Sequence, residues 1–406
     1  PKTTPDIKGQ AVRSRGGRVV LHGESFDEAY AHARQIEAEK GQTFIHPYDD
    51  PDVIAGQGTV GMEILRQHPD PIDAIFVPIG GGGLAAGIAV FVKFLRPEVK
   101  VFGVEPDDAA SMAEAIAADS RVILNQVGLF ADGVAVRQAG EETFRLCKSL
   151  LDGVVTVSTD EICAAVKDIF EDTRAIAEPS GAVSLAGLKA YVERGEARGG
   201  ALVAINSGAN MNFDRLRHIA ERAELGEKRE ALLSVTIPEK PGSYRRFIQL
   251  LGKRAITEFN YRYADPEKAE IFVGVHLDSG GEDKRQILAL LAEHGYPVLD
   301  MSDNELAKLH VRYMVGGKTR GMEGERIFRF QFPERPGALL KFLTSLSGGW
   351  NISLFHYRNH GADYGRVLAG IQVPADEHDQ LKRRLDDLGY PYWEETDNPA
   401  YRAFLG

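Results

Sequence analysis

The sequence predicts an α/β domain with a parallel sheet in residues 1–224, followed by two α+β units in residues 225–322 and 323–406. In the first part, short apolar runs alternate with helix-like stretches, which is typical of a parallel sheet covered by helices. Around residues 217–230 the chain becomes charged and helical, which indicates a connector between domains. The remainder contains an internal repeat, so one small unit is expected twice.

The elements of the first domain follow from these patterns. Short, apolar runs predict buried strands at Ala74 to Pro78, Val99 to Val104, Val154 to Val157 and Ala201 to Ile205. Helices are expected at 28–40 before the stop at Gly41, at 84–95, from a cap at Thr159 and Asp160 to Thr173, and at Gly181 to Tyr191.

The repeat rests on landmarks that recur in the same order, 94 to 96 residues apart. The matching segments are 234–242 with 329–337, 259–262 with 355–358, 272–274 with 368–370, and 295–297 with 389–391. Each copy follows the order strand, helix, strand, strand, helix, strand, which is a split βαβ unit of the ferredoxin type. In the first copy these elements are predicted at 232–237, 242–253, 256–263, 269–277, 283–294 and 298–301.

Composition excludes several classes of protein. The net charge of −11 argues against nucleic acid or an anionic membrane as the main partner. No apolar run reaches the roughly 20 residues that span a bilayer. Cys147 and Cys163 stand in helix-like apolar patterns without a CxxC or Cys/His cluster, so we expect buried thiols and no metal.

Four glycines, Gly80, Gly81, Gly82 and Gly83, join a predicted strand to a predicted helix that begins with Leu84. Without Cβ atoms, successive backbone N–H groups and the helix N-terminus can converge on a phosphate. A tight turn is the alternative, although it needs only one or two glycines. The pattern is neither GxGxxG nor a Walker loop, which favours a phosphorylated cofactor other than a nucleotide.

Two further polar turns are candidates for the same site. Ser207 follows the strand that begins at Ala201, and the carboxyl ends of parallel strands are where such folds bind ligands. Glu178 precedes the helix that begins near Gly181. The alternatives are a Ser-Gly turn without a ligand and a helix-capping loop.

These motifs carry a family resemblance. GGGGL at Gly80–Leu84, EPSGA at Glu178–Ala182 and SGAN at Ser207–Asn210 resemble the tryptophan-synthase-β-like (fold type II) pyridoxal-phosphate enzymes. PKTTP at Pro1–Pro5, IAGQGT at Ile54–Thr59 and NSGANMNF at Asn206–Phe213 resemble the biosynthetic threonine dehydratases among them. The paired C-terminal units are similar to the ACT-like regulatory domains of that family.

The resemblance implies pyridoxal 5'-phosphate as cofactor, with Gly80 to Gly83 and Leu84 at its phosphate, Ser207 at its ring nitrogen and Glu178 beside it. It implies conversion of L-threonine to 2-oxobutanoate and ammonia, the first committed step of isoleucine biosynthesis, inhibited by isoleucine and opposed by valine. It also suggests a homotetramer, and a cytoplasmic location is the default.

The resemblance places effector-binding residues in the repeat. Tyr261 and Tyr357 stand at equivalent positions, each in a predicted strand before an arginine. Leu339, Leu343 and Leu346 have helical spacing and are expected to border the effector or to form the core face of their helix. Arg254 is a candidate for the effector carboxylate. The alternatives are sheet packing for the tyrosines and a solvated surface for the arginine.

One departure from the family is expected to matter. The Schiff-base lysine motif and the substrate-carboxylate loop, which precede PKTTP in the family, are not found here. No catalytic residue is therefore assigned, and the chain as given is expected to be catalytically incompetent. Three rival functions are another fold-type-II enzyme such as serine dehydratase, serine racemase or threonine synthase, a non-catalytic amino-acid sensor, and a nucleotide-binding oxidoreductase.

Overall fold

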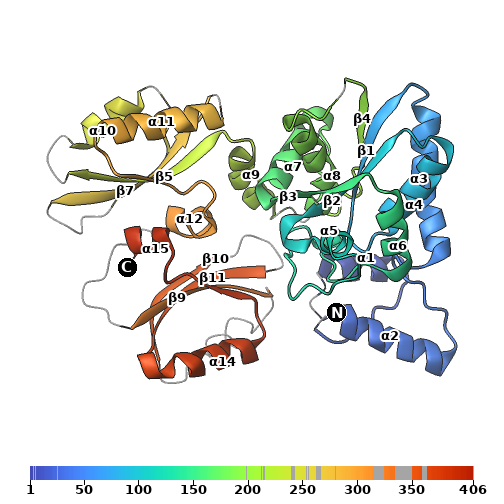
Figure 1. The fold of residues 1–406 in the computed structure, drawn as a ribbon. Helices are drawn as coiled ribbons and strands as arrows, with labels where there is room; N and C mark the ends of the chain where they lie inside the picture. The colour runs from blue at the N-terminus through green and yellow to red at the C-terminus, as the bar shows by residue number, and fades with distance from the viewer. Residues whose placement is uncertain are drawn as a thin grey trace. The chain divides into compact units, whose positions relative to one another are not determined.

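The computed structural model describes residues 1–406 except 3, 5, 25, 198, 212, 214, 239–242, 253, 255, 262–266, 279, 314–323, 334–349, 359–363 and 406. The chain divides into two compact units, Pro1–Ile219 and Ala220–Gly406, each with its own core (Figure 1). Their boundary falls inside helix α9 (Arg215–Gly226), within the stretch predicted to be a connector.

The first unit is built on a parallel sheet, as predicted. Its strand order is β3-β2-β1-β4, with every neighbouring pair parallel. The strands are β1 (Ile72–Pro78), β2 (Lys100–Pro106), β3 (Gly153–Val157) and β4 (Ala201–Ala204). Because the strands are parallel, their carboxyl ends share one edge of the sheet.

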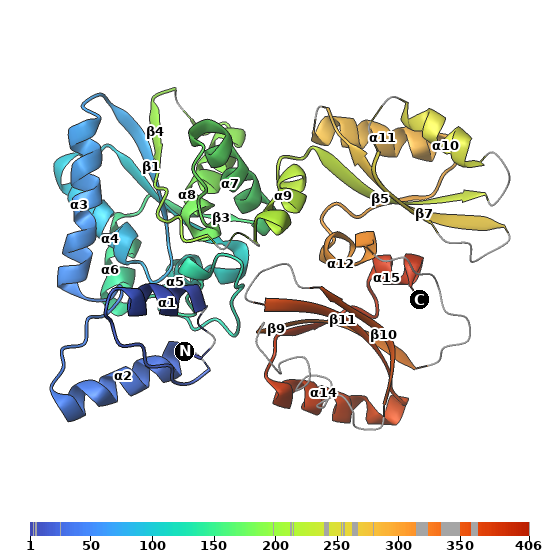
Figure 2. The same cartoon turned by 180° about the vertical axis from the view of Figure 1, so that it is seen from behind.

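Helices cover both faces of this sheet (Figure 1, Figure 2). One face carries α3 (Pro51–Gln67), α4 (Gly83–Leu95) and α6 (Glu141–Leu150), and the other carries α7 (Thr159–Thr173) and α8 (Pro179–Glu193). Successive side chains of a strand point to opposite faces of the sheet, so neighbouring residues of β1 contribute to the apolar cores on both faces. Ile75 of β1 joins the apolar cluster of α4, whereas Phe76 stacks on Phe102 at 5.4 Å and meets Tyr191 of α8 at 5.3 Å.

Further helices and turns complete the unit. They are α1 (Asp6–Ser14), α2 (Phe26–Lys40) and α5 (Ser111–Ala117), with 3-10 turns η1 (Asp107–Ala109) and η2 (Asp132–Val134). None of these except α2 was predicted.

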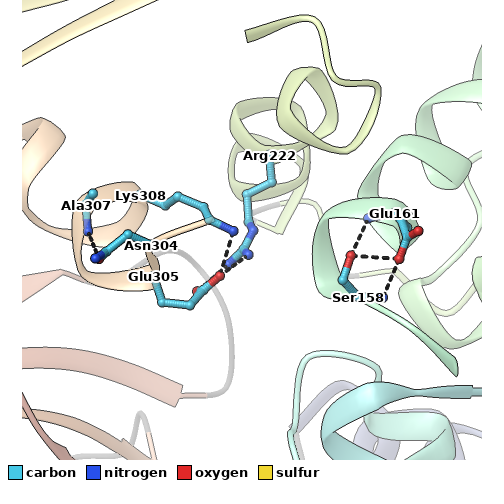
Figure 3. Close-up of polar contacts among 7 residues, drawn as sticks. All are labelled: Ser158, Glu161, Arg222, Asn304, Glu305, Ala307 and Lys308. Atoms are coloured by element: carbon cyan, nitrogen blue, oxygen red, sulfur yellow. Dashed lines mark hydrogen bonds and ion pairs between the residues drawn. The ribbon is translucent and has the colours of Figure 1, made fainter. Parts of the chain in front are cut away.

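The predicted cap of α7 at Thr159 and Asp160 is wrong. Ser158 is the N-cap, because its backbone is still extended whereas Thr159 is already helical. Ser158 and Glu161 form a capping box, in which the Glu161 carboxylate accepts from the Ser158 N–H at 2.7 Å and the Ser158 hydroxyl accepts from the Glu161 N–H at 3.3 Å (Figure 3).

The second unit contains two antiparallel sheets of the same topology, which confirms the predicted repeat. Their strand orders are β6-β7-β5-β8 and β10-β11-β9-β12. The first sheet with its helices comprises β5 (Glu230–Pro238), α10 (Ser243–Leu251), β6 (Ile256–Tyr261), β7 (Lys268–His276), α11 (Gly281–Glu293) and β8 (Val298–Asp300). The second comprises β9 (Glu325–Pro333), β10 (Asn351–Arg358), β11 (Tyr364–Gln372), η4 (Ala375–Glu377), α14 (His378–Leu388) and β12 (Tyr392–Glu394).

The two copies share a core through equivalent residues. Leu232 and Phe272 of the first sheet cluster with their repeat counterparts Ile327 and Leu368 of the second. The cluster also holds residues of α12 (Glu305–Leu309), which η3 (Val311–Tyr313) follows, and of α15 (Pro399–Phe404). Equivalent residues of the two copies thus lie in one apolar cluster.

Two asparagines at equivalent positions of the repeat are hydrogen-bonded to each other. Asn304 caps α12 and Asn398 caps α15, and the Asn304 Nδ2 donates to the Asn398 Oδ1 at 3.0 Å. In the parts of both units that are described, no helix is both long and apolar enough to cross a membrane.

Candidate functional site

The glycine loop lies between β1 and α4, as the sequence predicted. Gly82 has φ of +99°, in the left-handed region that glycine adopts without strain. Gly82 is also the N-cap of α4 and supplies no side chain, so a side-chain cap is absent from the start of this helix. Buried amides at a helix N-terminus without such an acceptor form a binding site for an anion.

Close packing fixes the outer side of this loop. A Cβ atom on Gly81 would lie 2.2 Å from the Tyr48 ring, and one on Gly83 would lie 2.9 Å from the Tyr48 carbonyl oxygen. A Cβ on Gly82 would lie 2.8 Å from Met112 and from Thr143. Close packing therefore explains why these positions are glycine. The feature that indicates an anion site is the start of α4, which has no side-chain cap.

The loop that carries Ser207 follows β4, the neighbour of β1 in the sheet. Ser207 is exposed, and its hydroxyl lies 3.5 Å from the Ser180 carbonyl oxygen. Glu178 holds this loop, because its N–H donates to the Gly208 carbonyl at 3.1 Å and its carboxylate accepts from the Asn210 N–H at 3.1 Å. The same carboxylate accepts from the Ser180 hydroxyl at 2.8 Å. Glu178 thus orients the Ser207 loop on the start of α8.

The turn η2 lies between the two loops, and no sequence pattern predicted it. A Cβ on Gly80 would lie 3.1 Å from the Val134 Cα, and one on Gly133 would lie 2.5 Å from the Ser180 hydroxyl. The structure therefore brings Gly80, Ser207 and Glu178 to one edge of the sheet, with η2 between them.

Asp132 anchors η2 to two other segments. Its carboxylate accepts from the Lys8 ammonium at 2.6 Å and from the Arg215 guanidinium at 3.2 Å. Burial alone would raise the pKa of Asp132, but these two cations outweigh burial and hold the pKa below its ordinary value. Asp132 is therefore a carboxylate at neutral pH.

Glu105 ends β2 beside this edge and is fully buried. Burial raises its pKa to about 7, although the N–H groups of Met112 at 2.9 Å and Ala113 at 2.8 Å favour the carboxylate. Met112, whose N–H donates to Glu105, also lies beside Gly82 together with Thr143.

This edge fits pyridoxal phosphate. The uncapped amides of α4 suit a phosphate dianion, and the exposed Ser207 hydroxyl on the adjacent strand end suits a ring nitrogen. The Leu84 side chain packs half-buried against the apolar core, and its backbone N–H belongs to the first turn of α4. Within the described residues, no group of three or more His, Cys, Asp or Glu side chains gathers as a metal site would require.

The predicted effector residues are only partly described. Tyr261 lies in β6 opposite Ile271, and Tyr357 lies in β10 opposite Val367, so both pairs sit in the same register. Their side chains are not described, and Leu339, Leu343 and Leu346 fall in residues 334–349, outside the described part. Their roles stay predictions.

Arg254 is already engaged within its own copy. Its guanidinium donates to the Asp283 carboxylate at 2.5 Å and to the Leu251 carbonyl at 3.1 Å. An effector carboxylate would have to share this guanidinium with Asp283.

Two family models account for nearly the whole chain. The model of pyridoxal-phosphate dependent enzymes matches residues 1–208, and the C-terminal regulatory domain of threonine dehydratase matches residues 221–311 and 316–405. The first unit is thus a pyridoxal-phosphate enzyme domain of fold type II. With the regulatory domain matched twice behind it, the chain belongs to the threonine dehydratase family.

Individual relatives agree with this assignment. The L-threonine dehydratase biosynthetic IlvA of Burkholderia multivorans is 59% identical over all of this chain and 80% of its own length, and that of Escherichia coli is 56% identical over all of this chain and 78% of its own. The processed threonine deaminase isoform 2 of Solanum lycopersicum superposes with a TM-score of 0.54 at 51% identity, over 55% of this chain and 62% of that one. These matches give no support to the expectation that the chain is inactive.

Proposed function

We propose that this protein deaminates L-threonine to 2-oxobutanoate and ammonia, the water lost in the elimination being regained on hydrolysis, under control of an amino-acid effector bound by its second unit. The observation that carries the proposal is the meeting of an uncapped α4 N-terminus and an exposed Ser207 hydroxyl at adjacent strand ends. Family membership supports the substrate, because the relatives carry the name threonine dehydratase.

Residues of this chain would bind the cofactor and orient it. The amides of Gly80 to Gly83 and of Leu84 would hold the cofactor phosphate, with Gly82 opening the helix. The Ser207 hydroxyl would donate to the ring nitrogen without giving it a full positive charge, which favours β-elimination over transamination. Glu178 keeps Ser207 in place through Asn210. When bound, the cofactor supplies the electron withdrawal that acidifies the substrate Cα–H.

The second unit is the proposed regulatory part. We expect isoleucine to inhibit and valine to oppose it, with Tyr261, Tyr357 and the leucines Leu339, Leu343 and Leu346 near the effector. The support is the duplicated regulatory domain, since coupling requires a second site with its own ligand. A homotetramer and a cytoplasmic location also belong to the proposal. Location varies among relatives, because the yeast protein is named mitochondrial and the Arabidopsis protein chloroplastic.

The test is 2-oxo acid release by the full-length gene product, measured as 2-oxobutanoate from L-threonine and as pyruvate from L-serine and O-acetylserine, each with and without isoleucine. We expect threonine to give the highest kcat/KM and isoleucine to suppress its turnover. Preference for another substrate would indicate a different fold-type-II enzyme. Effector binding without any turnover would indicate the amino-acid sensor instead.

A further inference from the structure

The glycine loop cannot orient its own peptide groups. Residues 80–83 have no side chains, and glycine has the largest conformational freedom of any residue. An anion site made of backbone amides requires those amides to point at the ligand before it arrives, because ordering them on binding would cost affinity. Contacts from other segments must therefore fix the direction of these peptides.

Thr143 of α6 fixes the central peptide. Its hydroxyl is fully buried and donates to the Gly81 carbonyl oxygen at 2.6 Å, and the Gly140 N–H approaches the same oxygen at 3.3 Å. A trans peptide is planar, so its C=O and the following N–H point in opposite directions. Holding the Gly81 carbonyl toward α6 therefore turns the Gly82 N–H away from α6.

Asp49 in turn fixes α6. Its Oδ2 accepts from the Glu141 N–H at 2.8 Å, and its Oδ1 accepts from the Glu142 N–H at 3.0 Å and the Thr143 N–H at 3.2 Å. The helix's own N-cap, Gly140, supplies no side chain. Asp49 thus caps the first turn of a helix more than ninety residues later in the chain, and its charge is favourable at the positive end of that helix.

The segment that contains Asp49 also contacts the glycine loop directly. Tyr48 precedes Asp49, and its ring covers Gly81 so closely that no Cβ atom fits. The His46 ring nitrogen Nδ1 accepts from the Asp49 N–H at 2.8 Å, which holds this turn in shape. The glycine loop therefore packs between Tyr48 and Thr143. Asp49 links these two residues, because it follows Tyr48 in the chain and accepts from the Thr143 N–H.

We propose that Asp49 and Thr143 are positioning residues for the phosphate of the cofactor, acting through the Gly81 peptide. The inference rests on the proposed phosphate site in residues 80–83. Affinity for the phosphate group then depends on the Thr143 hydroxyl and the Asp49 carboxylate, neither of which touches the phosphate.

The test measures the dissociation constants of pyridoxine 5'-phosphate and pyridoxine, which lack an aldehyde and so cannot form imines with lysines. The quantity compared is the dissociation constant of pyridoxine divided by that of pyridoxine 5'-phosphate, because general loss of structure would weaken binding of both ligands alike and leave this ratio unchanged. In Thr143→Val we expect pyridoxine 5'-phosphate to bind roughly tenfold more weakly, with pyridoxine unchanged. Thr143→Ser keeps the hydroxyl and should restore the wild-type ratio.

Asp49→Asn should lower the ratio roughly threefold to tenfold, since the amide keeps one acceptor oxygen and loses the charge. Asp50→Asn is the matched control: Asp50 caps α3 through Asp52 and Val53, and it should leave the ratio unchanged. Thermal unfolding of each variant establishes that it is folded.

The outcomes separate the two claims. If the wild type binds both ligands equally, the proposed phosphate site is wrong and the inference falls with it. If the wild type prefers the phosphate and folded Thr143→Val keeps that preference, the phosphate site stands and the positioning role is overturned. An unchanged ratio in folded Asp49→Asn overturns the role of Asp49.

Discussion

The two regulatory copies keep the same sheet but differ at one position just before the second strand. In the first copy Arg254 forms an ion pair with Asp283 of α11. At the equivalent position of the second copy, the Trp350 indole N–H donates to the Glu377 carboxylate at 2.6 Å. Asp283 stands twelve residues before Gly295, which follows the C-cap of α11, and Glu377 stands twelve residues before Gly389, the C-cap of α14. In both copies, the side chain at this position connects the second strand to the second helix through an acidic residue. The acidic residue is present in both copies, whereas its partner changes from arginine to tryptophan.

A second pair of positions shows the same contrast. Glu230 at the start of β5 accepts from the Thr257 hydroxyl and forms an ion pair with Arg312 at 2.9 Å. Its counterpart Glu325 at the start of β9 accepts from the hydroxyls of Ser353 and Tyr401. The shared carboxylate faces a buried cation in one copy and neutral groups in the other, so the copies should respond differently to the same substitution.

The largest difference is expected between Glu230→Gln and Glu325→Gln. The side chains of Glu230 and Arg312 are 4% and 9% exposed, so removing the carboxylate charge takes away the ion-pair partner of a buried cation. We expect a loss of about 3–5 kcal/mol in the free energy of unfolding for Glu230→Gln and about 1–2 kcal/mol for Glu325→Gln. Urea unfolding of the full chain measures both. Equal losses would remove the contrast between the copies.

Glu305 is the next test, because the second copy has Pro399 in its place. The Glu305 carboxylate pairs with Arg222 of α9 at 2.7 Å and with Lys308 at 2.9 Å (Figure 3). Burial would raise the pKa of Glu305, but the two cations outweigh burial and hold the pKa well below its ordinary value. Its contribution to stability is therefore present above about pH 4.5 and is lost as the pH falls below that.

Because the Glu305 side chain is 35% exposed, solvent screens its ion pairs, and we expect Glu305→Gln to lose about 2 kcal/mol at pH 7 and to lose less further stability on acidification than the wild type. Urea unfolding at pH 7 and at pH 4 checks both statements. A variant that matches the wild type at pH 7 would show that the network does not stabilise the first copy.

Glu105 in the first unit should give the opposite sign of pH dependence. Its folded pKa of about 7 lies above its ordinary value of 4.5, so the native state binds more protons between these values. Stability should therefore fall as pH rises from about 4.5 to about 7 and level off above that, by about 2–3 kcal/mol in all. The difference in free energy of unfolding between wild type and Glu105→Gln, followed across this range, isolates the effect. A constant difference would contradict it.

The smallest stability effects are expected at Arg254 and its counterpart Trp350. Arg254→Met and Trp350→Phe should each lose about 1 kcal/mol, because each removes one hydrogen-bonded contact between a strand and a helix. If Arg254 serves only as this contact, isoleucine inhibition of the full-length enzyme stays intact in Arg254→Met. Tyr261→Ala should blunt that inhibition instead. Loss of the isoleucine response in Arg254→Met would restore Arg254 as an effector ligand.

Much of the fold could be predicted from the sequence, because it depends on local patterns. Continuous apolar runs gave the parallel strands, and the repeated landmarks gave two units of one topology. The candidate site was found only where glycine and serine turns follow strands. The turn η2, the cap from Asp49 and the hydroxyl of Thr143 depend on contacts across long stretches of sequence, and no local pattern signals them.

The hydrogen bond between Asn304 and Asn398 has a consequence for assembly. Joining both copies in one polypeptide makes their encounter intramolecular, at an effective concentration in the millimolar range for a short linker. Pairing of the two copies should then be independent of how much protein is present. A chain with a single copy would have to recruit a second molecule to cover Leu232 and Phe272, and its folding would become dependent on dilution.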